Sequence, residues 1–221
     1  MRILYLDNHV LAVLKPRNMP VQPDASGDED LQSALKCYLK QTYQKPGNVY
    51  LGIVHRLDRP TGGVMVFART SKAAARLSGQ FRARTVQRCY YAVVWDCRTP
   101  VGVHVELEDS LVQHKDRVRV AEAEEPGAKL ARLGYQKLEE RRRLSLLNIT
   151  LHSGRKHQIR VQLSARAMPI WGDMRYGKQE KGHIALFAHT LCIDHPTTKE
   201  RLTFTAGPQG YPFSLFAGRG N

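Results

Sequence analysis

The stretch IVHRLDRPTGGVMVFA, residues 53–68, determines how the rest of the chain is interpreted. Its second half is a β-branched and aromatic run that predicts a buried strand. In its first half, a proline and two glycines mark a tight loop where backbone can approach a ligand closely. Asp58, Arg56 and Arg59 therefore lie on a loop between rigid segments, a common place for catalytic groups. A salt-bridged surface turn is the alternative interpretation.

The charge of the chain predicts a polyanionic partner. The 221 residues include 34 lysines and arginines against 20 acidic residues, which gives a net charge of +14. RNA, DNA and an anionic membrane would each suit such a charge. No apolar run approaches the length of a membrane span and no basic amphipathic helix dominates, so nucleic acid is favoured.

The cysteine pattern predicts a reducing compartment. The four cysteines are scattered, without a C-x-x-C pair or the Cys/His spacing of a zinc site. They are expected to be free thiols. The chain begins as a strand without the apolar segment of a signal peptide, so a cytoplasmic protein is expected. The cysteines are Cys37, Cys89, Cys97 and Cys192.

Hydrophobic periodicity predicts a mixed α and β chain that is rich in strands. Helices are expected from residue 31 after an acidic start, from Ser71 as a cap with a buried stripe of Ala74, Leu77 and Phe81, and from near residue 156 to residue 168. Strands are expected over residues 3–6, 10–14, 64–68, 89–95, 102–107, 130–138, 147–151, 185–193 and 202–205.

Four segments resemble motifs of one family. Residues 55–63 resemble the H-R-L-D-x-x-T-S-G signature of the RluA family of RNA pseudouridine synthases. Residues 13–21 resemble the first motif of that family, and residues 153–161, SGRKHQIRV, resemble its T-G-R-x-H-Q-I-R-V motif. Residues 169–177 resemble the P-I-x-G-D-x-x-Y-G that follows. The matches are in family order and extend to about residue 206.

The resemblance implies an α+β pseudouridine synthase fold, with a mixed, largely antiparallel sheet bent around a central active-site cleft and flanked by helices. Residues 1–221 are then expected to form a single catalytic domain of two lobes sharing one sheet. A C-terminal tail is expected from about residue 207. We also expect the form of the family without an extra N-terminal RNA-binding domain.

The resemblance implies that a uridine in tRNA or rRNA is isomerised to pseudouridine. Asp58 matches the catalytic aspartate of the family, and carboxylates serve glycosidases in a similar way. Arg160 matches the arginine that pairs with this aspartate. Tyr90 matches a tyrosine that stacks on the target base, with core packing as the alternative role. The resemblance implies neither a metal nor a cofactor, and it leaves open whether Asp58 acts on the sugar or the base.

Further motif residues are expected to bind or position the RNA, and a monomer without an obligate protein partner is expected. Arg56 resembles the arginine that fills the space left by the flipped base. His157 is expected to be a hydrogen-bonded scaffold residue rather than a base. The complete set is Lys15, Arg56, Arg59, Thr61, Arg88, Arg155 and His157.

Three departures from the family pattern bear on substrate choice. Gly62 replaces the usual serine, Arg88 the usual lysine, and Phe187 a histidine of many relatives. Two other functions stay open from the residues. One is an RNA-binding protein without catalysis. The other is a hydrolase with His55 and Asp58 as metal ligands, for which the sequence offers no second ligand cluster.

Overall fold

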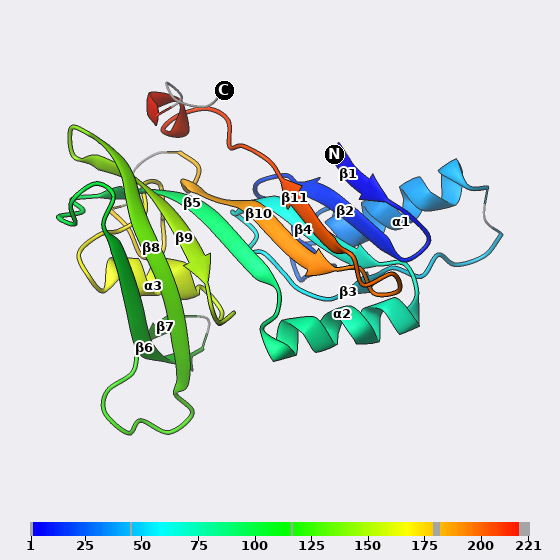
Figure 1. Cartoon of the computed structure of the whole chain (residues 1–221), viewed down its shortest axis with the longest axis horizontal. Helices are drawn as coiled ribbons and strands as arrows, with labels where there is room; N and C mark the ends of the chain where they lie inside the picture. Colours follow the sequence, from blue (N-terminus) through cyan, green and yellow to red (C-terminus); the bar gives the residue numbers. More distant parts are fainter. Residues whose placement is uncertain (1, 45, 116, 179–181, 217–221) are drawn as a thin grey trace. The chain divides into compact units, whose positions relative to one another are not determined.

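The computed structural model describes residues 2–44, 46–115, 117–178 and 182–216, and it divides the chain into two compact units (Figure 1). The first unit comprises residues 1–87 and 190–206, and the second comprises residues 88–189 and 207–221. The prediction of one domain whose lobes share a sheet stays a prediction. Within the described ranges, no helix combines the length and the apolar character needed to cross a bilayer.

The first unit is built on an antiparallel sheet. Strand β2 pairs with β1 on one side and with β4 on the other, and Lys15 lies opposite Gly63 in the second pair. The short β3 also pairs with β4, and β11 pairs with the end of β10. All seven residues of β4 are buried, which confirms the predicted strand. The bounds are β1 Arg2–Leu6, β2 Val10–Lys15, β3 Gly52–Ile53, β4 Gly62–Ala68, β10 Leu186–Asp194 and β11 Arg201–Thr205.

Two amphipathic helices complete the first unit, α1 (Leu31–Thr42) and α2 (Ser71–Ala83). Asp30 caps α1 by accepting a hydrogen bond from the amide of Ser33 at 3.0 Å. The predicted cap of α2 was wrong by one residue, because Thr70 accepts from the Ala73 amide at 3.1 Å. Capping side chains of this kind satisfy amides that lack a partner within the helix.

The buried stripe of α2 also differs from its prediction by one position. Leu77 is buried as expected, but its buried neighbour is Ala73 rather than Ala74. Ala74 and Phe81 are partly buried and pack against the same core, which includes Val10 and Val66. The helix therefore covers the sheet with a stripe broader than one row of residues.

The second unit is an antiparallel sheet in the order β5-β9-β8-β6-β7, which also includes the first residues of β10. Helix α3 (Gln158–Ser164) packs Val161 against Leu111, Val118 and Ala131 of this sheet. Strand β7 was not predicted. The other bounds are β5 Gln87–Trp95, β6 His104–His114, β7 Arg117–Val120, β8 Lys129–Arg141, β9 Leu144–Leu151 and the short 3-10 helix η1, Phe213–Phe216.

Helix α3 is shorter than predicted. His157 precedes the helix with φ of 53°, a left-handed conformation, so it does not continue the helical face of Arg160 and Ser164 as expected. The helix ends at Ser164 rather than near Met168. The residues from 158 to 163 are all buried, including the predicted inward-facing Ile159 and Leu163. The helix is therefore a core element with no solvated face.

The described part of the predicted C-terminal tail, residues 207–216, includes a short helix with buried side chains. This part belongs to the second unit, and Phe213 and Phe216 of η1 are buried. Residues 217–221 of the predicted tail lie outside the described residues. All four cysteines are free thiols, as predicted.

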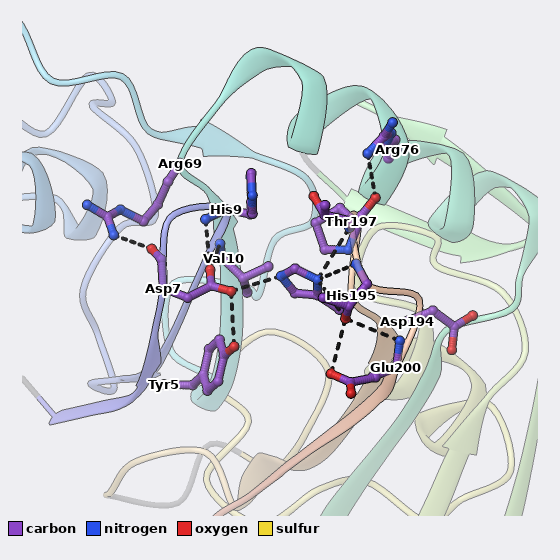
Figure 2. Close-up of polar contacts among 12 residues, drawn as sticks. Tyr5, Asp7, His9, Val10, Arg69, Arg76, Asp194, His195, Thr197 and Glu200 are labelled. Atoms are coloured by element: carbon purple, nitrogen blue, oxygen red, sulfur yellow. Dashed lines mark hydrogen bonds and ion pairs between the residues drawn. The ribbon is translucent and has the colours of Figure 1, made fainter.

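A polar network joins distant segments at one end of the first unit (Figure 2). Asp7 accepts hydrogen bonds from the amides of His9 and Val10 at 2.7 and 2.6 Å, and His195 Nε2 lies 2.8 Å from its other oxygen. His195 Nδ1 accepts from the Thr198 amide at 2.9 Å, so His195 carries its proton on Nε2 and donates it to Asp7. The network therefore ties the β1–β2 turn to the β10–β11 turn.

Asp7→Asn should lower stability in a pH-dependent way. Burial raises the pKa of Asp7, but hydrogen bonds from Val10, His9, Tyr5 and His195 outweigh it, so this pKa lies below its usual value. The carboxylate therefore contributes stability above a pH of about 4, which is lost as the pH falls through the folded-state pKa. Urea denaturation should show Asp7→Asn less stable by about 1–3 kcal/mol at pH 7. That deficit should narrow at pH 3, and an equal deficit at both pH values would contradict this account.

Candidate active site

Asp58 lies on the loop that joins β3 to β4 in the first unit, and it is half-buried. The loop begins with His55, whose Nε2 accepts a hydrogen bond from the Val66 amide at 3.0 Å. The His55 ring also stacks on Phe81 with centroids 4.8 Å apart. His55 is thus a neutral anchor that fixes the loop to the core strand.

This arrangement counts against the metal-hydrolase interpretation. The Nε2 lone pair of His55 is already used by a main-chain amide, so it is not available to coordinate a metal. Across the part of the chain that the structure describes, no group of three or more histidine, cysteine, aspartate or glutamate side chains could hold a metal ion.

The Lys15 ammonium lies beneath the loop and donates to three main-chain carbonyls. Its Nζ is 2.9 Å from the oxygen of Pro16, 3.0 Å from that of Arg59 and 2.8 Å from that of Thr61. Only 1% of Lys15 is exposed. The Thr61 amide in turn donates to the main-chain carbonyl oxygen of Asp58 at 2.9 Å, which closes the turn. Asp58 is therefore carried on a turn whose main chain is held on both sides of Pro60.

The same lysine is a cation that interacts electrostatically with Asp58. Burial lowers the pKa of Lys15 to about 7, while the Asp58 carboxylate opposes this shift and Arg59 adds to it. An ammonium in a poorly solvated place is costly unless it is hydrogen-bonded and near negative charge. Lys15 meets both conditions, because it donates to three main-chain carbonyls and lies near the Asp58 carboxylate.

The other loop residues differ in exposure. Arg59 pairs with Asp28 and donates to Ser26 at 2.9 Å, so its guanidinium links the loop to the segment before α1. Thr61 is buried, and its hydroxyl has no hydrogen-bond partner among the described residues. Arg56 is exposed at the loop surface. Of the RNA-binding set predicted for this loop, Arg56 and Arg59 are exposed, whereas Lys15 and Thr61 are buried.

The Gly62 departure has a steric explanation in the first unit. An ideal Cβ on Gly62 would lie 3.1 Å from Cγ of Arg17 and 3.3 Å from the carbonyl oxygen of Lys15. Gly62 has no left-handed φ, unlike Gly63 with φ of 135°. The absence of a side chain at position 62 therefore makes room for the Arg17 stem rather than relieving backbone strain.

Arg160 lies in α3 of the second unit and forms a buried, two-pronged ion pair with Asp173. Its Nε is 2.8 Å from one carboxylate oxygen and its Nη2 is 2.7 Å from the other. Burial raises the pKa of Asp173, but the hydrogen bonds and charge of Arg160 and the amides of Arg175 and Tyr176 bring it below its usual value. The pair fixes the plane of the guanidinium.

Gln158 organises the turn that leads into α3. Its side-chain oxygen accepts from the Ser153 hydroxyl at 2.7 Å and from the Arg155 amide at 3.0 Å. Its side-chain nitrogen donates to the Arg132 carbonyl at 3.0 Å. Gln158 is 3% exposed, so these bonds form inside the protein and hold the motif turn against β8.

The remaining predicted residues also lie in the second unit. Tyr90 is 8% exposed on β5, opposite Ile149 of β9, so core packing and base stacking both stay open for it. Arg88 lies over Gly154, where an added Cβ would be 2.6 Å from Nη1. Arg155 Nε donates to the Leu130 carbonyl at 3.1 Å.

The structure thus groups the predicted residues within units. Lys15, Arg56, Asp58, Arg59 and Thr61 belong to the first unit, and Tyr90, Arg88, Arg155, His157 and Arg160 to the second. The predicted pairing of Asp58 with Arg160 stays a prediction.

Sequence reasoning did not select three important residues, Asp173, Tyr176 and Gln158. All three lie inside the recognised motifs, and that was the signal that could have identified them.

Replacing Lys15 by methionine should loosen the Asp58 loop. The variant keeps most of the stem but leaves the Arg59 and Thr61 carbonyls without their buried donor. Unfolding free energy should fall by about 2 kcal/mol, and the Thr61 amide should exchange its hydrogen at least about tenfold faster. Lys72→Met, an exposed lysine of α2, is the matched control. Unchanged Thr61 exchange in Lys15→Met would show that the ammonium does not hold the turn.

Comparison with known proteins agrees with the motifs. A family model described as RNA pseudouridylate synthase matches residues 9–165. The tRNA pseudouridine synthase C of Haemophilus influenzae is 31% identical, with 94% of this chain and 92% of that protein covered. The ribosomal large subunit pseudouridine synthase D of Pseudomonas aeruginosa is 33% identical. That match covers 91% of this chain and 66% of that protein.

The fold agrees as well. The solved structure of human RNA pseudouridylate synthase domain containing 4 superposes with a TM-score of 0.78 at 22% identity, covering 97% of this chain and 90% of that one. This likeness confirms the predicted α+β fold with a mixed, mostly antiparallel sheet. Because the family model matches more than half of this chain, residues 9–165, the chain belongs to the family of RNA pseudouridylate synthases.

Proposed function

We propose that this enzyme converts specific uridines of tRNA or rRNA to pseudouridine, with Asp58 as the catalytic carboxylate. The proposed RNA classes come from the two curated relatives, one named for tRNA and one for the large ribosomal subunit. The net charge of +14 suits a polyanionic substrate. The observation that carries the proposal is the buried Lys15 ammonium, which pins the Asp58 turn through three carbonyls.

The proposed reaction is an isomerisation in which atoms balance without a second substrate. The N1–C1′ glycosidic bond of uridine breaks, the uracil turns, and C5 joins C1′. The proton lost from C5 is matched by the one that N1 gains. Asp58 acts either as a nucleophile or by stabilising positive charge at C1′. Both roles require an ionised carboxylate in a fixed position, and a turn held on both sides by a cation is suited to that.

Tyr90 and Arg160 are proposed to complete the catalytic group. Family resemblance assigns Arg160 as the partner of Asp58 and Tyr90 as the ring on which the target base stacks. The pair with Asp173 supports this role for Arg160, because it uses Nε and Nη2 and thereby orients the third nitrogen, Nη1. A guanidinium already fixed by one carboxylate loses little conformational freedom when it meets a second.

RNA binding is proposed to rest on the basic residues around the motifs. Arg56 is exposed, and it is proposed to occupy the space left by the flipped uridine. Arg59, Arg88 and Arg155 also donate hydrogen bonds within the protein, so they would bind RNA from positions that the protein has already fixed. We also propose that the protein acts in the cytoplasm, which its four free thiols support. We further propose that it is a monomer.

Pseudouridine maps of tRNA and rRNA test the substrate directly. They should be compared between cells that contain the gene, cells that lack it, and cells in which it is restored. We expect one or a few sites, in one of these RNA classes, to lose pseudouridine without the gene and to regain it on restoration. If both maps are unchanged while purified protein modifies neither RNA, the proposal is wrong.

A further inference from the structure

The hydroxyl of Tyr176 lies between two motif elements of the second unit. It is 3.1 Å from the amide nitrogen of Val118 in β7 and 2.8 Å from Nδ1 of His157, just before α3. The His157 and Tyr176 rings meet edge to face with centroids 5.5 Å apart. One phenol therefore connects the β6–β7 hairpin to the SGRKHQIRV motif.

The hydrogen-bond partners of the Tyr176 hydroxyl favour one tautomer of His157. A phenol has one hydrogen to donate, and its oxygen accepts from other donors. The Val118 amide can only donate, so the Tyr176 oxygen accepts that bond. Donation of the Tyr176 hydrogen to Nδ1 of His157, 2.8 Å away, is the arrangement that uses the hydroxyl both as an acceptor and as a donor. A neutral imidazole with an accepting Nδ1 carries its proton on Nε2.

His157 has an unusual main-chain conformation at the point where its side chain contacts Tyr176. Its φ of 53° is a left-handed conformation that few residues other than glycine adopt readily. The His157 side chain therefore leaves the main chain outside the regular geometry of α3. The hydroxyl of Tyr176 is one fixed partner of this side chain, 2.8 Å from its Nδ1.

Tyr176 also contacts the Arg160–Asp173 pair. The centre of the Arg160 guanidinium lies 5.1 Å from the centroid of the Tyr176 ring, within cation–π range. The Tyr176 amide donates to Asp173 at 3.1 Å, and its carbonyl accepts from the Ser164 hydroxyl at 2.6 Å. The ring and the main chain of Tyr176 therefore support Arg160, whereas its hydroxyl acts on His157.

We propose that Tyr176 is a positioning residue with two separable roles, and that His157 serves as a neutral Nε2–H donor to the RNA. The hydroxyl selects the tautomer of His157, and the ring supports Arg160. On this assignment His157 is not a general base, because Nδ1 is occupied and Nε2 is protonated. The role of His157 toward RNA rests on the proposed function, whereas its tautomer does not.

Tyr176→Phe separates these roles, since it removes the hydroxyl and keeps the ring. Nitrogen NMR of the imidazoles in the free protein should show a single Nε2–H tautomer for His157, and a mixture of tautomers in the variant. KM for the RNA should rise about fivefold with kcat within about twofold, because one substrate hydrogen bond is weakened. Tyr176→Leu, which also removes the ring, should lower kcat as well.

Two further variants distinguish this role from a loss of stability. Tyr135→Phe removes another phenol hydrogen bond of the same unit, 2.7 Å to Thr99, and should change neither the His157 tautomer nor KM. In a His157→Ala background, adding Tyr176→Phe should raise KM no further, because the hydroxyl acts through His157.

Independent effects of the two substitutions on KM would overturn the proposal, as would an Nδ1–H tautomer in the parent protein. The NMR measurement needs no turnover, so an enzyme that modified no RNA would refute the proposed function while leaving the tautomer assignment separately testable.

Discussion

The buried Lys15 ammonium is the interaction on which the active-site loop depends. Main-chain hydrogen bonds hold β2 and β4 side by side as antiparallel neighbours, but strand pairing alone does not set the course of a polar turn. Lys15 extends from the end of β2 and binds main-chain oxygens on both sides of Pro60, including that of Thr61 next to β4. The loop therefore inherits the rigidity of the sheet, which is what a catalytic carboxylate on a loop requires.

The second unit also contains a buried charged group that is fully hydrogen-bonded, here a carboxylate instead of an ammonium. Asp173 is almost fully buried, and it is retained because Arg160 and two main-chain amides satisfy it. Breaking such a pair leaves an uncompensated charge in the interior, which costs far more than a surface ion pair contributes. Tyr176 then links this pair to His157 and β7. In a strongly basic protein, the cation proposed for catalysis is thus distinguished by its fixed geometry rather than by its charge alone.

Local patterns predicted the strands, the start of α1 and the motif loop, because alternation and caps are encoded within a few residues. Two of the three carbonyl partners of Lys15, those of Arg59 and Thr61, lie more than forty residues away, and no local pattern encodes them. The residues around His157 have helical spacing, yet the main chain of His157 is left-handed and the helix starts only after it, which the spacing does not encode. The four-residue β7 was missed although its sequence, RVRV, alternates, because so short a run is a weak signal for a strand. The family resemblance selected Asp58 and Arg160, whereas the pairing of Arg160 with Asp173 became visible only in the structure, although Asp173 lies in a recognised motif.

The most direct test of the central claim, that the pinned carboxylate of Asp58 performs the chemistry, is pseudouridine yield from Asp58→Asn. The variant keeps the shape of the side chain and removes its charge and nucleophile. Folding, RNA affinity and pseudouridine formation should be measured on one preparation. We predict that the variant still folds, that RNA binding is equal or tighter because a negative charge has left a basic surface, and that no pseudouridine is detectable. A folded Asp58→Asn protein that still converted uridine at a fair fraction of the parent rate would contradict the account.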